Sequence, residues 1–137
     1  MRISILLPFK ENFSPSYAGA VSLFINDTLR ISKYKKDTTV FGNTNFKEKF
    51  NLKYVNIPLQ KKFFQSQNKK YVEEFIKLEK KRDSDLIELH NRPIYLTYLF
   101  NNLNNKTYIL LFFHPTHKLL KKGLRPLWIC SLVCLSV

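Results

Sequence analysis

Short apolar runs, each bounded by polar turn residues, set the strongest limit on how this chain can fold. Runs of this length are typical of strands that are buried on both faces of a sheet. Between most of them lie segments with the apolar spacing of helices. Strands that alternate with helices predict βαβ units, and therefore an α/β fold with a parallel sheet flanked by helices. The predicted strands are 3–7, 38–41, 54–57, 85–89 and 108–113.

The segments between these strands predict helices of two kinds. The first opens at Gly19, and the second spans 69–82, and both have an apolar stripe on one face. The third, 94–100, is apolar almost all round, which predicts a buried helix. The exposed face of the second helix is expected to carry four lysines: Lys69, Lys70, Lys80 and Lys81.

Two of the apolar runs end abruptly in a histidine. His90 follows the run 85–89, and His114 follows the run 108–113. Ligands of open parallel sheets bind beyond the carboxyl ends of the strands. We therefore expect both imidazoles at the rim of one crevice. The alternative for His114 is a buried histidine with satisfied hydrogen bonds.

Two loops expected at the same edge carry groups that suit a polar ligand. Gly19 and Ala20 are small and open the first helix, whose N-terminus offers free N–H groups and a partial positive charge to a phosphate. The corner after the fourth strand offers hydrogen bonds to hydroxyls or charge to an anion, through His90, Asn91 and Arg92. The alternatives are a simple tight turn at Gly19, and a helix cap at Asn91 beside a solvated Arg92.

The charge balance raises nucleic-acid binding as a function. The formal net charge is +13 over 137 residues, and strongly basic chains often bind polyanions. Of the 23 basic residues, 18 are lysine and five are arginine, whereas base readout and bidentate phosphate binding rely on arginine. We therefore expect a solvated lysine surface and no nucleic-acid partner, with a basic nucleic-acid-binding protein as an alternative.

The segment 115–137 differs in composition from everything before it. It contains no Asp, Glu, Asn, Gln, Phe or Tyr, yet it holds Trp128 and both cysteines. We expect this tail to be the product of a frameshift or truncation, and the alternative is that 127–137 forms one more strand or helix. Cys130 and Cys134 lack further ligands at zinc-site spacing, so no metal site is predicted.

The chain shows no targeting or membrane-spanning pattern. The apolar stretch at its start is too short for the hydrophobic region of a signal peptide. No stretch reaches the roughly 18 apolar residues of a transmembrane helix. We therefore expect a cytoplasmic protein with no integral membrane segment.

Taken together, these features resemble the N-terminal domain of GT-B glycosyltransferases of the family 4 type. The similarity rests on the first strand 1–8, the small-residue loop 19–21, and the two strands that end in His90 and His114. It covers residues 1–114. The resemblance implies an incomplete Rossmann-like domain over 1–114, followed by the anomalous tail 115–137.

The resemblance also implies roles for individual residues. Gly19 and Ala20 match the loop that approaches the donor phosphate, and His114 matches the active-site histidine that contacts the transferred sugar. The acceptor-side corner is matched by His90, Asn91 and Arg92. The implied reaction transfers a sugar from a nucleotide sugar to an acceptor hydroxyl, with retention at the anomeric carbon, and needs no metal or other cofactor.

The same resemblance sets the expected partners. They are a nucleotide sugar and an acceptor glycan, bound together with a second domain, so the chain alone is expected to show little or no activity. Peripheral association with a membrane belongs to the same expectation. The alternative function is a stand-alone Rossmann-like binding module for an anionic ligand.

Overall fold

Six strands and three helices make up the part of the chain that the structure describes. In this computed structural model, that part comprises residues 1–59, 66–103, 107–112 and 133–136. The elements follow one another as β1 (Ile3–Leu6), α1 (Ala20–Ile31), β2 (Thr38–Gly42), β3 (Tyr54–Asn56), α2 (Gln67–Arg82), β4 (Leu86–His90), α3 (Ile94–Phe100), β5 (Tyr108–Phe112) and β6 (Val133–Ser136).

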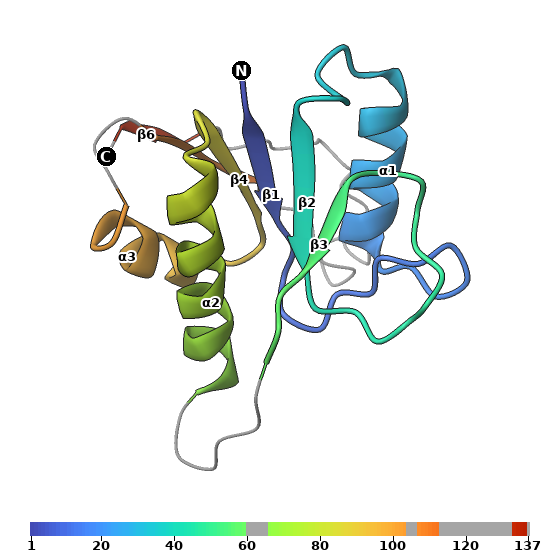
Figure 1. The fold of residues 1–137 in the computed structure, drawn as a ribbon, viewed down its shortest axis with the longest axis horizontal. Helices are drawn as coiled ribbons and strands as arrows, with labels where there is room; N and C mark the ends of the chain where they lie inside the picture. The colour runs from blue at the N-terminus through green and yellow to red at the C-terminus, as the bar shows by residue number, and fades with distance from the viewer. Residues whose placement is uncertain (60–65, 104–106, 113–132, 137) are drawn as a thin grey trace, which may run out of the picture.

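All strands belong to one sheet with the order β3-β2-β1-β4-β5-β6, in which β1 to β5 are parallel. The chain moves outward from β1 to β3, crosses back to β4 beside β1, and then moves outward in the other direction (Figure 1). The prediction of an α/β, Rossmann-like fold with a parallel sheet flanked by helices is confirmed. Each predicted strand forms, and its bounds agree with the prediction within one residue at either end.

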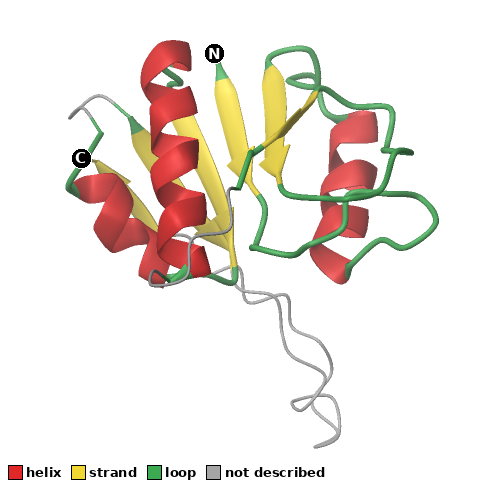
Figure 2. Ribbon diagram, turned by 60° about the horizontal axis from the view of Figure 1, so that its bottom comes forward, coloured by secondary structure: helices red, strands yellow, loops and turns green. Residues whose placement is uncertain are grey.

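The helices cover both faces of this sheet. Successive side chains of each strand point to opposite faces, so each strand contributes to both apolar layers. On one face α1 packs its apolar stripe against β1 and β2, through Val21, Ile25, Leu29, Ile3, Ile5 and Val40. On the other face α2 and α3 pack against the alternate strand residues, through Val72, Phe75, Leu99, Leu6, Ile87, Leu89 and Ile109. Figure 2 shows α2 and α3 together over one side and α1 on the other. Two apolar layers therefore hold the sheet between them.

The tail contributes one strand to the sheet. β6 pairs with β5 in antiparallel register, from Tyr108↔Ser136 to Leu111↔Val133. This agrees with the alternative that one more strand forms within 127–137. The rest of the tail, including Cys130, lies outside the described residues, and Cys134 is placed only as a backbone position of β6.

Two burial predictions are wrong. In α3 Tyr95 and Leu99 are buried, and Leu96, Tyr98 and Phe100 are partly buried against the core, but Ile94 is 58% exposed, so the helix is not buried all round. In α2 the side chain of Lys70, predicted on the exposed face, is only 8% exposed. α2 lies against both the sheet and α3, so more of its circumference is covered than in an ordinary surface helix. The long aliphatic stem of a lysine can be buried against apolar neighbours.

Candidate functional site

The loops that follow β1 and β4 leave the sheet side by side. These strands are hydrogen-bonded neighbours, with Ile3 opposite Leu86 and Leu6 opposite Leu89. From β1 the chain turns toward β2, and from β4 it turns toward β5, so the two loops diverge at this point. Such a switch point at the carboxyl edge is where open α/β sheets bind ligands. We therefore take this edge as the candidate site.

Both loops contain a residue with a left-handed backbone. Lys10 has φ 68° and Asn91 has φ 53°, and the other such non-glycine residue in the described part, Asp83, ends α2. Asparagine tolerates this conformation, whereas a lysine there is less common and is held by its surroundings. Two of the residues with unusual backbones thus lie at the candidate site.

Two buried tyrosines hold the β1–α1 loop in place. The Tyr71 hydroxyl on α2 donates to the Leu7 carbonyl at 2.9 Å, and the Phe9 amide donates to the Tyr95 hydroxyl on α3 at 3.1 Å. Tyr95 in turn donates to the Asn68 side-chain carbonyl at 3.3 Å. The Tyr71 bond is buried and the two bonds of Tyr95 are partly buried, and a hydrogen bond away from water is worth more than one at the surface. The start of the loop is therefore fixed by side chains from both helices on one face of the sheet.

Burial sets the ionisation of the two tyrosines. It raises the pKa of Tyr71 well above its usual range, and it raises the pKa of Tyr95 as well. For Tyr95, the amide of Phe9 and the guanidinium of Arg92 lower the pKa and so offset part of the increase that burial causes. The amide of Tyr95 also donates to the Arg92 carbonyl at 3.0 Å. Tyr95 therefore joins the loop after β1, through its hydroxyl, to the corner after β4, through its amide.

The three residues of that corner have different surroundings. His90 is the last residue of β4 and its side chain is fully buried. The amide of Asn91 donates to the Phe112 carbonyl at 2.9 Å, which extends the pairing with β5. Arg92 is exposed. The alternative of a helix cap at Asn91 is wrong, because the N-cap of α3 is Pro93, which makes no side-chain capping hydrogen bond.

The imidazole of His90 is enclosed by aromatic rings and a carboxylate. Its ring stacks on Phe112 with centroids 5.2 Å apart, and the ring of Phe24 meets it edge-on at 5.9 Å. Its Nε2 lies 2.6 Å from Oε1 of Glu88, two residues earlier on the same strand face. A ligand at this edge of the sheet would therefore meet Asn91 and Arg92, which are less buried than the His90 ring.

The N-terminus of α1, predicted to receive a phosphate, already holds a carboxylate of the chain. The amide of Ser22 in the first turn donates to Oε1 of Glu11 at 3.0 Å. A side chain at Gly19 would collide with the Glu11 carboxylate, so the missing Cβ of Gly19 makes room for it. Glu11 thus satisfies a free amide and complements the helix dipole, as a bound anion would. A ligand phosphate at Gly19 and Ala20 would have to displace it.

The predicted pair of histidines cannot be compared in full, because His114 lies outside the described residues. The structure brings Asn91 and Arg92 to the same edge as the loop 7–19, with His90 directly beneath them. Sequence reasoning missed Phe9, Glu11, Tyr71 and Tyr95. A signal was available for the two tyrosines, since each sits beside an apolar helix stripe, while nothing in the sequence indicated Glu11.

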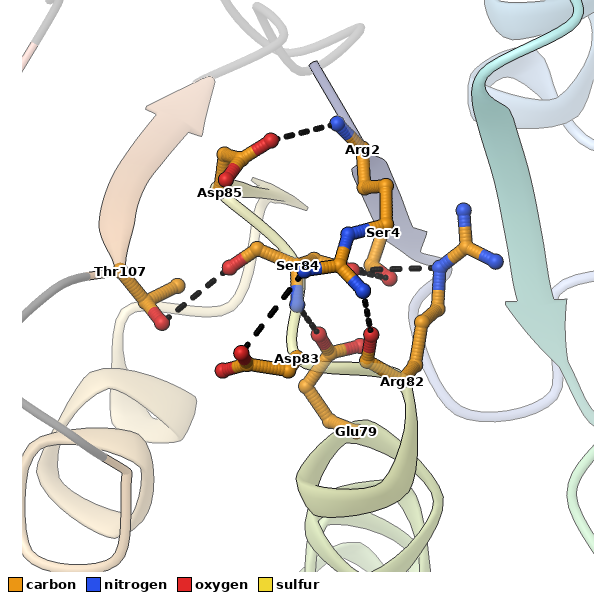
Figure 3. Close-up of polar contacts among 8 residues, drawn as sticks. All are labelled: Arg2, Ser4, Glu79, Arg82, Asp83, Ser84, Asp85 and Thr107. Carbon is orange, nitrogen blue, oxygen red and sulfur yellow. Dashed lines mark hydrogen bonds and ion pairs between the residues drawn. The ribbon is translucent and has the colours of Figure 1, made fainter.

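A second polar cluster lies at the opposite, amino edge of the sheet (Figure 3). The Ser84 hydroxyl lies 2.8 Å from that of Ser4, its amide donates to Glu79 at 2.9 Å, and its carbonyl accepts from Thr107 at 3.2 Å. These groups bond to one another and tie α2 to β1 and to the start of β5. The cluster therefore serves the fold.

Comparison with known proteins adds no family. No family model matches the chain, and no curated protein matches it either. Among the residues that the structure describes, no group of three or more His, Cys, Asp or Glu could hold a metal ion. The helices in that same part are too short or too polar to cross a membrane. The arguments for function therefore come from the fold and from the geometry of the carboxyl edge.

Proposed function

We propose that the chain is the acceptor-side part of a retaining glycosyltransferase that moves a sugar from a nucleotide sugar to an acceptor hydroxyl. The observation that carries this proposal is the junction at Tyr95. Its amide donates to the Arg92 carbonyl in the corner after β4, and its hydroxyl accepts the Phe9 amide in the loop after β1, at the switch point of the sheet. A fixed pair of loops at this edge suits a ligand with many hydroxyls, because it offers donors and acceptors at set positions. A cytoplasmic location belongs to the same proposal.

In this proposal the accessible groups of the two loops bind the substrates. Arg92 and Lys10 are exposed cations, and Asn91 offers an amide for a sugar hydroxyl. His90 lies below them and orients the corner through its pair with Glu88. His114 keeps the role of the residue that contacts the transferred sugar.

The leaving diphosphate of the donor needs electrostatic stabilisation and exclusion of water. Glu11 works against a phosphate at the N-terminus of α1, since its carboxylate holds the amide of Ser22. The proposal therefore assigns the diphosphate to a second domain that closes the cleft, and it expects little or no turnover from the chain alone. Clear multiple turnover by the purified chain with a panel of nucleotide sugars and acceptors would contradict this part.

Binding can be tested without turnover. In amide NMR spectra of the full chain, neutral oligosaccharides and nucleoside diphosphates are titrated separately. We expect oligosaccharides to shift the amides of the loops 7–19 and 91–93. Arg92→Gln is expected to weaken this binding about tenfold, as for loss of a hydrogen bond to a charged group. Lys81→Gln, an exposed change at the far end of α2, is the matched control and should leave the affinity unchanged.

The exposed charges of Lys10 and Arg92 favour one second candidate, a stand-alone binding module for an anionic ligand. The same titrations separate the two. Saturable binding of nucleoside diphosphates at these loops, with no response to neutral oligosaccharides, would support the module and exclude acceptor binding.

A further inference from the structure

Basic side chains gather at the amino edge of the sheet, where the two long helices end. We call this surface the basic edge, and define it by Arg2, residues 30–37, Lys53 and residues 80–85. It carries nine basic residues against three acidic ones: Arg2, Arg30, Lys33, Lys35, Lys36, Lys53, Lys80, Lys81 and Arg82, against Asp37, Asp83 and Asp85. The basic edge is contiguous. The starts of β1, β2 and β4 are neighbours in the sheet, and a hydrogen bond from Arg82 to the Asp37 carbonyl joins the end of α2 to the turn before β2.

The acidic groups of the basic edge are already engaged. The side chain of Asp85 accepts the amide of Arg2 at 2.6 Å, and Asp83 lies 3.7 Å from the guanidinium of Arg2 (Figure 3). Asp37 lies 3.8 Å from the amino group of Met1. By contrast, the exposed ammonium groups of Lys35, Lys36, Lys80 and Lys81 have no ion pair with any described residue. The field that reaches solvent from this edge is therefore positive.

Apolar and aromatic side chains stand among these lysines. Ile31 at the end of α1 is 89% exposed, although isoleucine is among the residues most often buried. Tyr34 is 37% exposed, and the ammonium group of Lys33 lies 5.0 Å from the centre of its ring. Basic residues interspersed with exposed aliphatic and aromatic tips are typical of surfaces that bind the interface of a bilayer. A nucleic acid would use the lysines but gives Ile31 no role.

The turn that carries these side chains is fixed by its own hydrogen bonds. The Ser32 hydroxyl accepts the amide of Tyr34 at 3.1 Å, and the Tyr34 carbonyl accepts the amides of Asp37 and Thr38 at 3.0 and 3.1 Å. Arg82 reaches across from the end of α2 and donates to the Asp37 carbonyl at 3.0 Å. Because the turn is rigid, docking would cost little conformational entropy.

We propose that the basic edge docks the protein onto a membrane surface that contains anionic lipids, with Ile31 and Tyr34 entering the interface and the lysines contacting the headgroups. This surface lies at the opposite end of the sheet from the candidate site. It gives a location to the peripheral membrane association that the resemblance implies, but the observations behind it do not depend on the reaction proposed for that site.

Vesicle sedimentation tests the proposal with the full chain. Vesicles of phosphatidylglycerol and phosphatidylcholine in equal parts are compared with vesicles of phosphatidylcholine alone, and we expect binding to the first only. Lys35→Gln with Lys36→Gln should weaken binding about fivefold per lysine. The matched control, Lys47→Gln with Lys69→Gln, removes two exposed lysines outside the basic edge and should leave binding unchanged.

Ile31→Ser separates a membrane from a nucleic acid. The residue is almost fully exposed, so the variant should keep the thermal midpoint of the parent, while its affinity for the anionic vesicles falls several-fold. Failure of the parent chain to bind anionic vesicles would overturn the proposal, as would an equal loss in the control pair. Tight binding of single-stranded RNA together with unchanged vesicle binding by Ile31→Ser would also overturn it, in favour of a polyanion surface.

Discussion

At the scale of single residues, the carboxylate of Glu11 changes what the loop around Gly19 can do. Glycine before a helix is compatible with close approach of a ligand, and this was the basis of the predicted phosphate loop. In the structure the space left by the missing Cβ is taken by Glu11, which accepts the Ser22 amide. Periodicity places helices and strands but does not determine the path of a loop, so this contact could not be predicted from the sequence.

A double-mutant cycle tests this arrangement. Glu11→Ala removes the carboxylate from the helix terminus and should lower the free energy of unfolding by about 1 kcal/mol, the usual value of an N-terminal cap. Gly19→Ala should cause a similar loss, because the new methyl group displaces Glu11. The combined variant should lose clearly less than the sum of the two. Additive losses in urea unfolding would show that Glu11 and Gly19 act independently.

His90 and Lys70 mark the same limit of residue-level prediction. A histidine at a strand end was expected to face a ligand, and a lysine was expected to face water. The rings of Phe24 and Phe112 enclose the histidine, and the wide contact surface of α2 covers the lysine. In both cases tertiary neighbours far along the chain decide the burial.

At the scale of elements, strands were predicted more accurately than the burial of helices. Most residues of the parallel strands are apolar on both faces, so each strand can be recognised in the sequence without knowledge of its neighbours. A seven-residue helix such as α3 has too few turns for its apolar pattern to show which side is covered. Its sequence is apolar nearly all round, yet only Tyr95 and Leu99 are fully buried, while Leu96, Tyr98 and Phe100 are partly buried and Ile94 is exposed.

Two substitutions in α3 compare the energetic contribution of a buried side chain with that of an exposed one. Leu99→Ala should lower the free energy of unfolding by about 2–5 kcal/mol, because it leaves a cavity in the core beside α2. Ile94→Ala, in the same helix but exposed, should change it by less than about 0.5 kcal/mol. Chemical denaturation of both variants checks the prediction, and comparable losses would mean that α3 is covered on both sides.

At the scale of the whole molecule, buried phenols connect helices, sheet and loops. Tyr71 and Tyr95 tie α2 and α3 to the loop after β1. Tyr54 stacks on the buried ring of Phe13, which lies in the same loop. Burial raises the pKa of Tyr54 from 10.0 to about 12, and it also raises the pKa of Tyr71 well above its usual range. The fold is therefore stabilised by tyrosines in their neutral form.

This gives an expected dependence of stability on pH. A tyrosine whose pKa is higher in the folded state contributes stability that is fully present below the unfolded value of 10.0 and is lost as the pH rises toward the folded value. The free energy of unfolding should thus fall between pH 10 and about pH 12. Tyr71→Phe should be less stable at neutral pH, through loss of its bond to Leu7, but should show a shallower alkaline decline. Tyr17→Phe, at an exposed position, is the control and should follow the parent profile.

The parallel part of the sheet could be inferred from local patterns because each of β1 to β5 has its own sequence signal, whereas β6 lies in the tail, where a strand was only an alternative. The function of the carboxyl edge could be inferred only in outline. Asn91 and Arg92 were placed at the correct corner, since the end of an apolar run locates a strand end. Tyr95 follows this corner closely in the chain, but its partner Phe9 lies far away in the sequence, so their contact depends on the completed fold.

Tyr95 contacts both loops, one through its amide and the other through its hydroxyl. An occupant that moves the corner displaces the Arg92 carbonyl that accepts the Tyr95 amide, and a shift of Phe9 removes the amide that donates to the Tyr95 hydroxyl. Slowed or accelerated hydrogen–deuterium exchange at the Phe9 amide would therefore register events at a corner more than eighty positions later in the chain. A single tyrosine gives this sheet edge the means to respond as one unit.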